Sequence, residues 1–142
     1  MDRTKNDIEG VSLKRRILIA DDEEMMRRLM RVSLDRPDYD IVEACDGHAA
    51  MKIIASTPID LMITDLCMPE QDGLEIIRAL RALHSNLKIV AVSGAFNGMF
   101  LAPACAFGAD AALPKPFRPD QLVTCVEGLL GTPANAPLPS PS

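Results

Sequence analysis

The sequence predicts an α/β domain built on a five-stranded, doubly wound parallel sheet. Short apolar runs of strand length alternate five times with segments of helical periodicity along the 142 residues. The runs are continuously apolar, which is typical of strands that helices cover on both faces. Because crossovers between parallel strands are right-handed, this alternation places helices on both sides of a single sheet.

The expected strands follow the apolar runs in order. They are Arg16–Ala20, Tyr39–Ala44, Ile59–Thr64, Lys88–Val92 and Ala111–Leu113. Between and after them, apolar side chains recur every three to four residues, the spacing of one helix face. This periodicity predicts helices at Glu23–Leu34, Gly47–Ser56, Leu74–His84 and Pro119–Leu130.

A short fourth helix is expected to begin near Leu101, after an irregular segment at Phe96–Phe100. Pro103 would lie in its first turn, where a missing backbone N–H costs no helical hydrogen bond. Met99, Phe100 and Leu101 would then either form an exposed apolar patch, which often marks a partner surface, or pack on the core.

One folded domain accounts for most of the chain, which is long enough to bury a core. We expect a flexible extension at residues 1–14, the domain at residues 15–130 and a disordered tail at residues 131–142. The tail, GTPANAPLPSPS, is rich in Pro and Ser and has no apolar periodicity.

Charge and cysteine content narrow the class of protein. The formal net charge of −5 argues against nucleic acid as a partner, and the basic cluster of Arg27, Arg28 and Arg31 fits the solvated side of an amphipathic helix. The charged opening MDRTKNDIEGVSLKRR predicts neither a signal peptide nor membrane insertion. The four cysteines form no CxxC pair, as expected of reduced thiols in a cytoplasmic protein.

Polar residues lie at the ends of four predicted strands. Asp21 and Asp22 follow the first strand, Asp65 the third, Ser93 the fourth and Lys115 the fifth. The carboxyl ends of parallel strands share one edge of the sheet, and open α/β sheets bind ligands outside that edge, where the winding direction reverses. The pattern therefore predicts that the acids after the first and third strands, a hydroxyl and an ammonium converge on one pocket.

The carboxylates at these ends indicate a site for a divalent cation. Asp21 and Asp22 would point to opposite faces in a regular strand, but where the strand ends both can face one pocket. With Asp65 they bring three like charges into one cleft, and Mg²⁺, which prefers oxygen ligands, relieves the repulsion. The alternative is that Asp21 and Asp22 only cap the next helix, which would not call for Asp65.

Asp65 has the chemistry of a phosphoryl acceptor. A carboxylate beside Mg²⁺ can attack phosphorus and form an acyl phosphate. The Ser93 hydroxyl and the Lys115 ammonium can stabilise charge on the phosphoryl group. Considered alone, Ser93 could be a turn serine and Lys115 a surface lysine. Their joint position at the strand ends is what indicates a site.

Four motifs, LIADDEE, ITDLCMPEQDGLE, AVSGA and LPKPF, occur in this order. They resemble the receiver domains of two-component response regulators, and the match runs from about Arg15 to Leu130. The resemblance implies the flavodoxin-like or CheY-like (βα)5 fold with strand order 2-1-3-4-5. It also implies a stand-alone receiver of the single-domain type.

The resemblance assigns a role to each candidate residue. Asp65 would be the phosphoacceptor, and Ser93 and Lys115 would contact the phosphoryl group. The Mg²⁺ ligands would be Asp21, Asp22, Asp65 and the backbone carbonyl of Cys67. The chain would act as a signalling domain rather than as an enzyme on other substrates, catalysing only its own phosphorylation and slow dephosphorylation.

The resemblance also implies partners. The phosphoryl group would come from a histidine kinase or a histidine phosphotransfer protein, and output would follow by conformational change or by phosphorelay. Receivers of this family often dock a downstream protein through the fourth helix, fifth strand and fifth helix.

The sequence departs from the family at Ala112, where many receivers carry Tyr or Phe. An alanine has no ring to turn inward, so we expect the Ser93–Gly94–Ala95 loop, with Phe96 or Phe100, to transmit the signal. Neither Cys67 nor Ala95 carries an acid or amide that orients a water, which predicts slow loss of the phosphoryl group.

Three other functions fit the pattern less well. A small-substrate phosphatase of this type usually has a second acid two residues after the nucleophile, where this chain has Cys67. A flavin or nucleotide binder needs a Gly- or Ser/Thr-rich loop after the first strand, and the Asp-Asp-Glu-Glu sequence there would repel phosphate. An unphosphorylated docking module would not require the full set of acidic, Ser and Lys residues.

Overall fold

Residues 14–68, 71–94 and 101–131 are described by a computed structural model. Five parallel strands form one sheet in the order β2-β1-β3-β6-β7. Their bounds are Arg15–Ala20 for β1, Tyr39–Ala44 for β2, Leu61–Asp65 for β3, Lys88–Ser93 for β6 and Ala111–Pro114 for β7. Numbered along this sheet alone, the order is 2-1-3-4-5, which confirms the predicted doubly wound fold.

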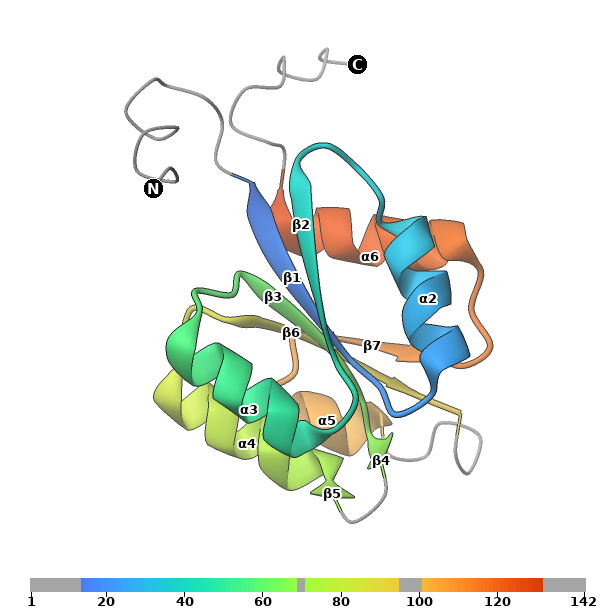
Figure 1. The fold of residues 1–142 in the computed structure, drawn as a ribbon. Coiled ribbons are helices and arrows are strands. Elements are labelled where there is room, and N and C mark those ends of the chain that lie inside the picture. The colour runs from blue at the N-terminus through green and yellow to red at the C-terminus, as the bar shows by residue number, and fades with distance from the viewer. Residues whose placement is uncertain (1–13, 69–70, 95–100, 132–142) are drawn as a thin grey trace, which may run out of the picture.

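Helices cover both faces of the sheet (Figure 1). They are α2 at Glu24–Ser33, α3 at Gly47–Ser56, α4 at Gly73–Leu83, α5 at Leu101–Phe107 and α6 at Pro119–Leu130. Helices α2 and α6 lie on one face, and α3, α4 and α5 lie on the other. A two-residue antiparallel pair, β4 at Cys67–Met68 and β5 at Gln71–Asp72, connects β3 to α4.

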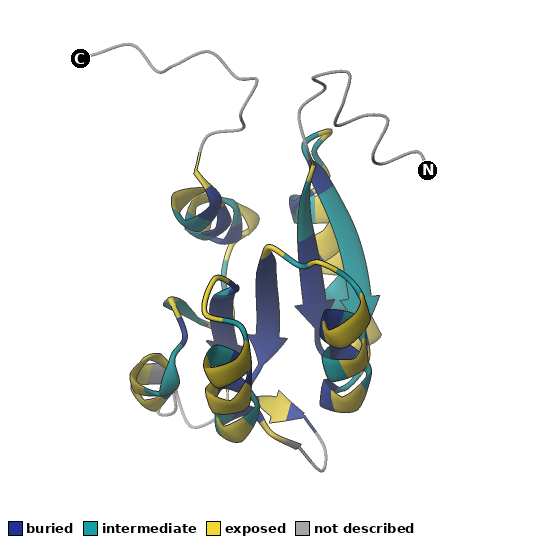
Figure 2. Ribbon diagram, turned by 90° about the vertical axis from the view of Figure 1, so that its left-hand side faces the viewer, coloured by how far each residue is buried: buried dark blue, intermediate teal, exposed yellow. Residues whose placement is uncertain are grey.

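Two apolar layers form the core because successive strand residues point to opposite faces. Ile17 and Ile19 of β1 pack with α2 and α6, whereas Leu18 and Ala20 pack with α3, α4 and α5. All four side chains are fully buried. Figure 2 shows the central strands buried between helices whose outer sides are exposed. The continuously apolar runs of β1, β3 and β6 thus reflect central strands that are covered on both faces.

The strand register places the functional ends side by side. Ala20 pairs with Thr64 across β1 and β3, and Asp65 pairs with Val92 across β3 and β6. The winding direction reverses between β1 and β3, since β2 lies on one side of β1 and all later strands lie on the other. Residues that follow β1 and β3 therefore meet at the switch point, where open α/β sheets bind ligands.

Several predicted bounds were off by one or two residues. Strand β3 begins at Leu61, not at Ile59, and includes Asp65, while β6 includes Ser93. Helix α4 begins at Gly73, because the Asp72 carboxylate caps it by accepting from the Leu74 amide at 3.1 Å. Helix α5 begins at Leu101, as predicted, with Pro103 in its first turn. The predicted Phe96–Phe100 segment and most of the expected termini lie outside the described residues.

Candidate functional site

Asp21 lies directly after β1 and is fully buried. Its amide still donates to the Ala44 carbonyl, at 3.2 Å, and so continues the pairing with β2. Its carboxylate accepts from the Glu23 amide at 2.9 Å and from the Lys115 ammonium at 3.1 Å. Both oxygens of this buried acid are therefore held in place.

Asp65, the last residue of β3, has a similar environment and is 5% exposed. One carboxylate oxygen accepts from the Cys67 amide at 2.9 Å, and the other accepts from Lys115 Nζ at 2.9 Å. Gly73 allows the chain to turn here, because a Cβ at that position would lie 2.6 Å from the backbone of Leu66. Only a residue without a side chain therefore fits where the start of α4 passes the backbone of Leu66.

Lys115 links the two buried acids across the sheet. It follows β7, and its side chain is only 14% exposed. Burial alone lowers the pKa of an ammonium, but hydrogen bonds and charge attraction to Asp65 and Asp21 outweigh it, so the pKa of Lys115 is raised. The Lys115–Pro116 peptide bond that follows is cis.

Asp22 completes an acidic cluster with the two buried acids. One carboxylate oxygen from each of Asp21, Asp22 and Asp65 lies within 4.8 Å of the others, and Asp22 is exposed to solvent. In the described parts of the chain, these are the residues whose grouping fits a metal ion. Burial raises the pKa of Asp21, and the nearby Asp65 raises it further, against the lowering effect of the Glu23 amide and Lys115.

The donor set of this cluster fits Mg²⁺. Three carboxylates and the Lys115 ammonium leave a formal charge of −2, which one divalent cation neutralises. The ligand atoms are all oxygens, and the exposed Asp22 leaves the site open on one side, which suits an ion that keeps several of its waters.

Ser93 is the last residue of β6 and is fully buried. Its hydroxyl lies 3.9 Å from the thiol of Cys67, whose backbone amide bonds Asp65. The Lys115 amide donates to the Ser93 carbonyl at 2.9 Å, and Gly94 packs closely on the Lys115 side chain, where an added Cβ would lie 3.1 Å from Lys115 Cβ. The structure therefore brings all the predicted site residues to one edge of the sheet.

The capping alternative accounts for only part of this arrangement. The N-cap of α2 is Glu23, and its side chain makes no capping hydrogen bond. Asp21 accepts from the Glu23 amide, just ahead of the helix. This bond involves one oxygen of Asp21 and does not explain why Asp22 and Asp65 lie beside it.

One residue beside the site was misread from the sequence. Arg27 was expected on the solvated side of its helix with Arg28 and Arg31, but its side chain is only 16% exposed. Its guanidinium donates to the Asp21 carbonyl at 2.7 Å and to the Glu43 carboxylate at 3.1 Å. Helical periodicity gives no sign of a bond to a residue six positions earlier.

Ala112, the expected departure from the family, lies in β7 opposite Ala91. Both positions are occupied by alanine, so no ring is present at this register position of the two strands. The loop expected to carry the signal instead continues through residues 95–100, which lie outside the described residues.

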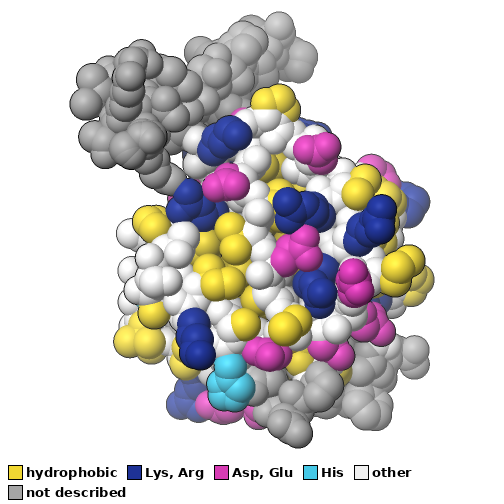
Figure 3. Space-filling model, viewed as in Figure 1, with side chains coloured by type: hydrophobic (Ala, Val, Ile, Leu, Met, Phe, Trp, Pro, Cys, Tyr) yellow, Lys and Arg dark blue, Asp and Glu magenta, His cyan; other side chains and the backbone are white. Residues whose placement is uncertain are grey.

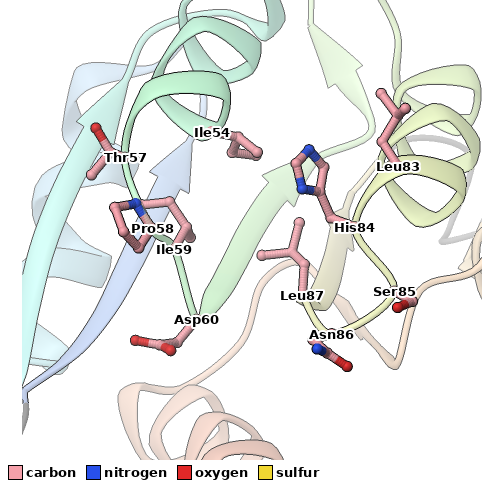
Figure 4. A pocket seen from close by; sticks show the side chains of 10 residues that line it. All are labelled: Ile54, Thr57, Pro58, Ile59, Asp60, Leu83, His84, Ser85, Asn86 and Leu87. Carbon is pink, nitrogen blue, oxygen red and sulfur yellow. The ribbon is translucent and has the colours of Figure 1, made fainter.

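A hollow lies at the edge of the sheet opposite the acidic cluster (Figure 4). Its volume is about 390 Å³, and Asp60 and Leu87, which precede β3 and β6, line it together with the ends of α3 and α4. His84 lines this hollow, and His48 is exposed on α3. His84 therefore lies at the edge of the sheet opposite the acidic cluster, whereas His48 lies in the first turn of α3.

The charged side chains are mixed on the surface. On the face shown in Figure 3, Lys and Arg side chains are interspersed with Asp and Glu side chains rather than gathered into one basic area. None of the helices in the described ranges has the length and apolar character needed to cross a membrane.

The fold and the strand-end cluster together define a class of protein. The family model described as response regulator receiver domain matches residues 17–127, so the chain belongs to this family. Receiver domains are signalling domains that accept a phosphoryl group from histidine kinases or phosphotransfer proteins and bind Mg²⁺ at an acidic pocket.

Similar proteins support the same assignment. The chain is 36% identical, over 115 residues, to the response regulator MprA of Mycolicibacterium vanbaalenii and to that of Mycobacterium tuberculosis. The alignments cover 81% of the chain and 50% of each relative, so the chain spans about half the length of these curated relatives.

Solved structures of receivers share the fold. The response regulator TrrA of Thermotoga maritima, in complex with Mg²⁺ and BeF, is 31% identical with a TM-score of 0.72, over 81% of this chain and 98% of that one. The receiver domain of Francisella response regulator 1452 is 26% identical with a TM-score of 0.74, over 82% and 96% of the two chains.

The acidic cluster predicts a measurable instability in metal-free protein. Asp22 is exposed, and its neighbours Asp21 and Asp65 repel it across less than 4.8 Å. In the presence of EDTA, Asp22→Asn should therefore increase the free energy of unfolding by about 0.5 to 1 kcal/mol, the size of such repulsion in a watery site. Urea unfolding measures this gain.

With added Mg²⁺, the wild type should become more stable to unfolding than Asp22→Asn. An ion that binds only the folded state stabilises it by mass action, and the wild type should gain more than Asp22→Asn. Asp35→Asn, an exposed acid beyond the end of α2, is the matched control and should not change the response to Mg²⁺. An equal Mg²⁺ response in Asp22→Asn would contradict a metal role for Asp22.

Proposed function

We propose that this chain is a phosphorylation switch in which Asp65 accepts a phosphoryl group in the presence of Mg²⁺. The observation that carries the proposal is the arrangement of Lys115 between two buried acids, Asp21 and Asp65, with a third acid beside them. A structural ion pair needs one acid and one base. The excess of acid at an exposed edge supports a site for a cation and an anion together.

In this proposal the metal ligands are Asp21, Asp22, Asp65 and the backbone carbonyl of Cys67. Bound Mg²⁺ would supply positive charge that offsets the charge on the phosphoryl oxygens. The short β4–β5 pair holds the backbone at Cys67, and the amide of the same residue already bonds Asp65.

Asp65, Lys115 and Ser93 would have separate roles in the phosphoryl transfer. A carboxylate oxygen of Asp65 attacks phosphorus, and the bond from phosphorus to the nitrogen of the donor phosphohistidine breaks as the imidazole leaves. Lys115, which contacts Asp65 Oδ2 at 2.9 Å, is within reach of a phosphoryl oxygen added there. The Ser93 hydroxyl, from the neighbouring strand, would donate to another oxygen of the group.

The donor would be a histidine kinase or a histidine phosphotransfer protein, and the chain would act in the cytoplasm. Output would use the surface of α5, β7 and α6. In chain order these are the fourth described helix, the fifth strand of the parallel sheet and the fifth described helix. Whether it signals by docking or passes the group onward is tested by comparing the partners captured by the phosphorylated and unphosphorylated forms.

The function is tested with acetyl phosphate as a small phosphoryl donor. Wild-type protein with Mg²⁺ should gain one phosphoryl group by intact mass, and EDTA should prevent the gain. A phosphatase acting on small substrates would instead release phosphate over many turnovers without accumulating labelled protein. Absence of a Mg²⁺-dependent mass gain would contradict the proposal.

A further inference from the structure

The acidic cluster depends on a turn directly after β1. In a continued strand, Asp21 and Asp22 would point to opposite faces of the sheet. Here the Asp21 amide still bonds β2, but the Glu23 amide turns back to the Asp21 carboxylate at 2.9 Å. The peptide bond between Asp21 and Asp22 is therefore where the alternation is broken and both acids are brought to one site.

Arg27 holds that peptide bond from α2. Its Nη1 donates to the Asp21 carbonyl oxygen at 2.7 Å, and its Nε donates to the Glu43 carboxylate of β2 at 3.1 Å. A peptide unit is planar, so fixing the Asp21 carbonyl also fixes the direction in which the chain enters Asp22. The planar guanidinium can make both bonds at once because its donors have a fixed geometry.

We propose that Arg27 is a positioning residue that sets the Mg²⁺ affinity of the acidic site by holding the Asp21–Asp22 peptide. This inference rests on the proposed function. A positive side chain beside a cation site would by itself weaken metal binding. Glu43 pairs with both Arg27 and Arg31, at 3.1 and 2.8 Å. Its carboxylate therefore offsets part of the positive charge of Arg27, while the guanidinium still holds the Asp21 carbonyl.

Arg31 offers a matched control on the same helix. It pairs with the same acid, Glu43, but its side chain is 52% exposed, and among the residues that the structure describes its side chain bonds only Glu43. Arg27→Gln and Arg31→Gln each remove one positive charge and one bond to Glu43. Of the two, Arg27→Gln removes the bond to the Asp21 carbonyl.

The test is an MgCl₂ titration of the metal-free full chain, followed by the amide shifts of Asp21, Asp22 and Asp65. Loss of a residue that orients metal ligands typically weakens affinity at least about tenfold, and that is the loss expected for Arg27→Gln, with Arg31→Gln within about twofold of wild type. Equal affinities in the two variants, or unchanged affinity in Arg27→Gln, would overturn the inference.

Failure of the proposed function has a different signature. If the wild type itself shows no saturable shift at these amides, the metal site is refuted together with the inference. If Arg27→Gln does not fold in urea-free buffer, Arg27→Lys takes its place, since it keeps the charge but cannot bond Glu43 and the Asp21 carbonyl together. Wild-type affinity in Arg27→Lys would then overturn the inference, because the two bonds of the guanidinium would not be needed, and weaker affinity would support positioning.

Discussion

Asp65→Asn is expected to abolish phosphoryl transfer to the chain. An amide is a poor nucleophile, and the substitution leaves Asp21, Asp22 and Lys115 in place while it removes the carboxylate that would attack phosphorus. With acetyl phosphate and Mg²⁺, the intact-mass gain of the wild type should fall at least about a hundredfold in rate, the size expected for removal of a covalent nucleophile.

The matched control is Asp60→Asn, at the opposite end of the same strand. The Asp60 carboxylate accepts from the Arg16 amide at 2.7 Å, a bond that an asparagine oxygen can also accept. Its labelling should equal that of the wild type. Labelling of Asp65→Asn at the wild-type rate would refute Asp65 as the acceptor.

Lys115→Met is expected to have the largest effect on stability. It leaves Asp21 and Asp65 buried without their shared cation, and breaking a buried ion pair in this way typically costs about 3 kcal/mol or more. Urea unfolding in EDTA measures this loss. Lys52→Met, an exposed lysine on α3, is the control and should change little.

The loss in Lys115→Met should grow with pH. The pKa of Asp21 is raised in the folded protein above its ordinary value of 3.8, so between the unfolded and folded pKa values the folded state binds more protons. Stability therefore falls as pH rises through that window. Lys115 lowers the pKa of Asp21, so its removal raises that pKa further and extends to higher pH the range over which stability falls. A destabilisation that is the same at pH 5 and pH 8 would contradict this account.

The fold could be predicted because its signals are local. Continuous apolar strands such as β1 and β3 require cover on both faces, and the helical stripes of α2 and α6 supply it. The site could be predicted because parallel strands with right-handed crossovers align their carboxyl ends. Once Asp65 and Lys115 were placed at strand ends, the topology brought them together without further information.

The details that could not be predicted involve contacts between distant segments. Arg81 of α4 donates to the Gly108 carbonyl at 3.0 Å and to Asp110 at 2.6 Å, across 27 and 29 residues, and neither bond leaves a periodic pattern. The bond from Arg27 to the Asp21 carbonyl is similar, since it joins a helix side chain to the backbone of a turn. The exact strand bounds also depend on pairing partners rather than on composition.

The consequences of Ala112 and Cys67 for output and for the lifetime of the phosphoryl group stay predictions from the sequence. Cys67 contacts the site through its amide, and its thiol lies 3.9 Å from the Ser93 hydroxyl. A thiol is a weak hydrogen-bonding group and does not orient an attacking water as an acid or amide does.

The most direct test of the central claim is to locate the phosphoryl group. Wild-type protein labelled with acetyl phosphate and Mg²⁺ is reduced with borohydride, which marks an acyl phosphate permanently, and is then digested and sequenced by tandem mass spectrometry. The account predicts one modified residue, Asp65, and no modification when EDTA replaces Mg²⁺. A mark on Asp21, Asp22 or another residue in place of Asp65 would contradict it.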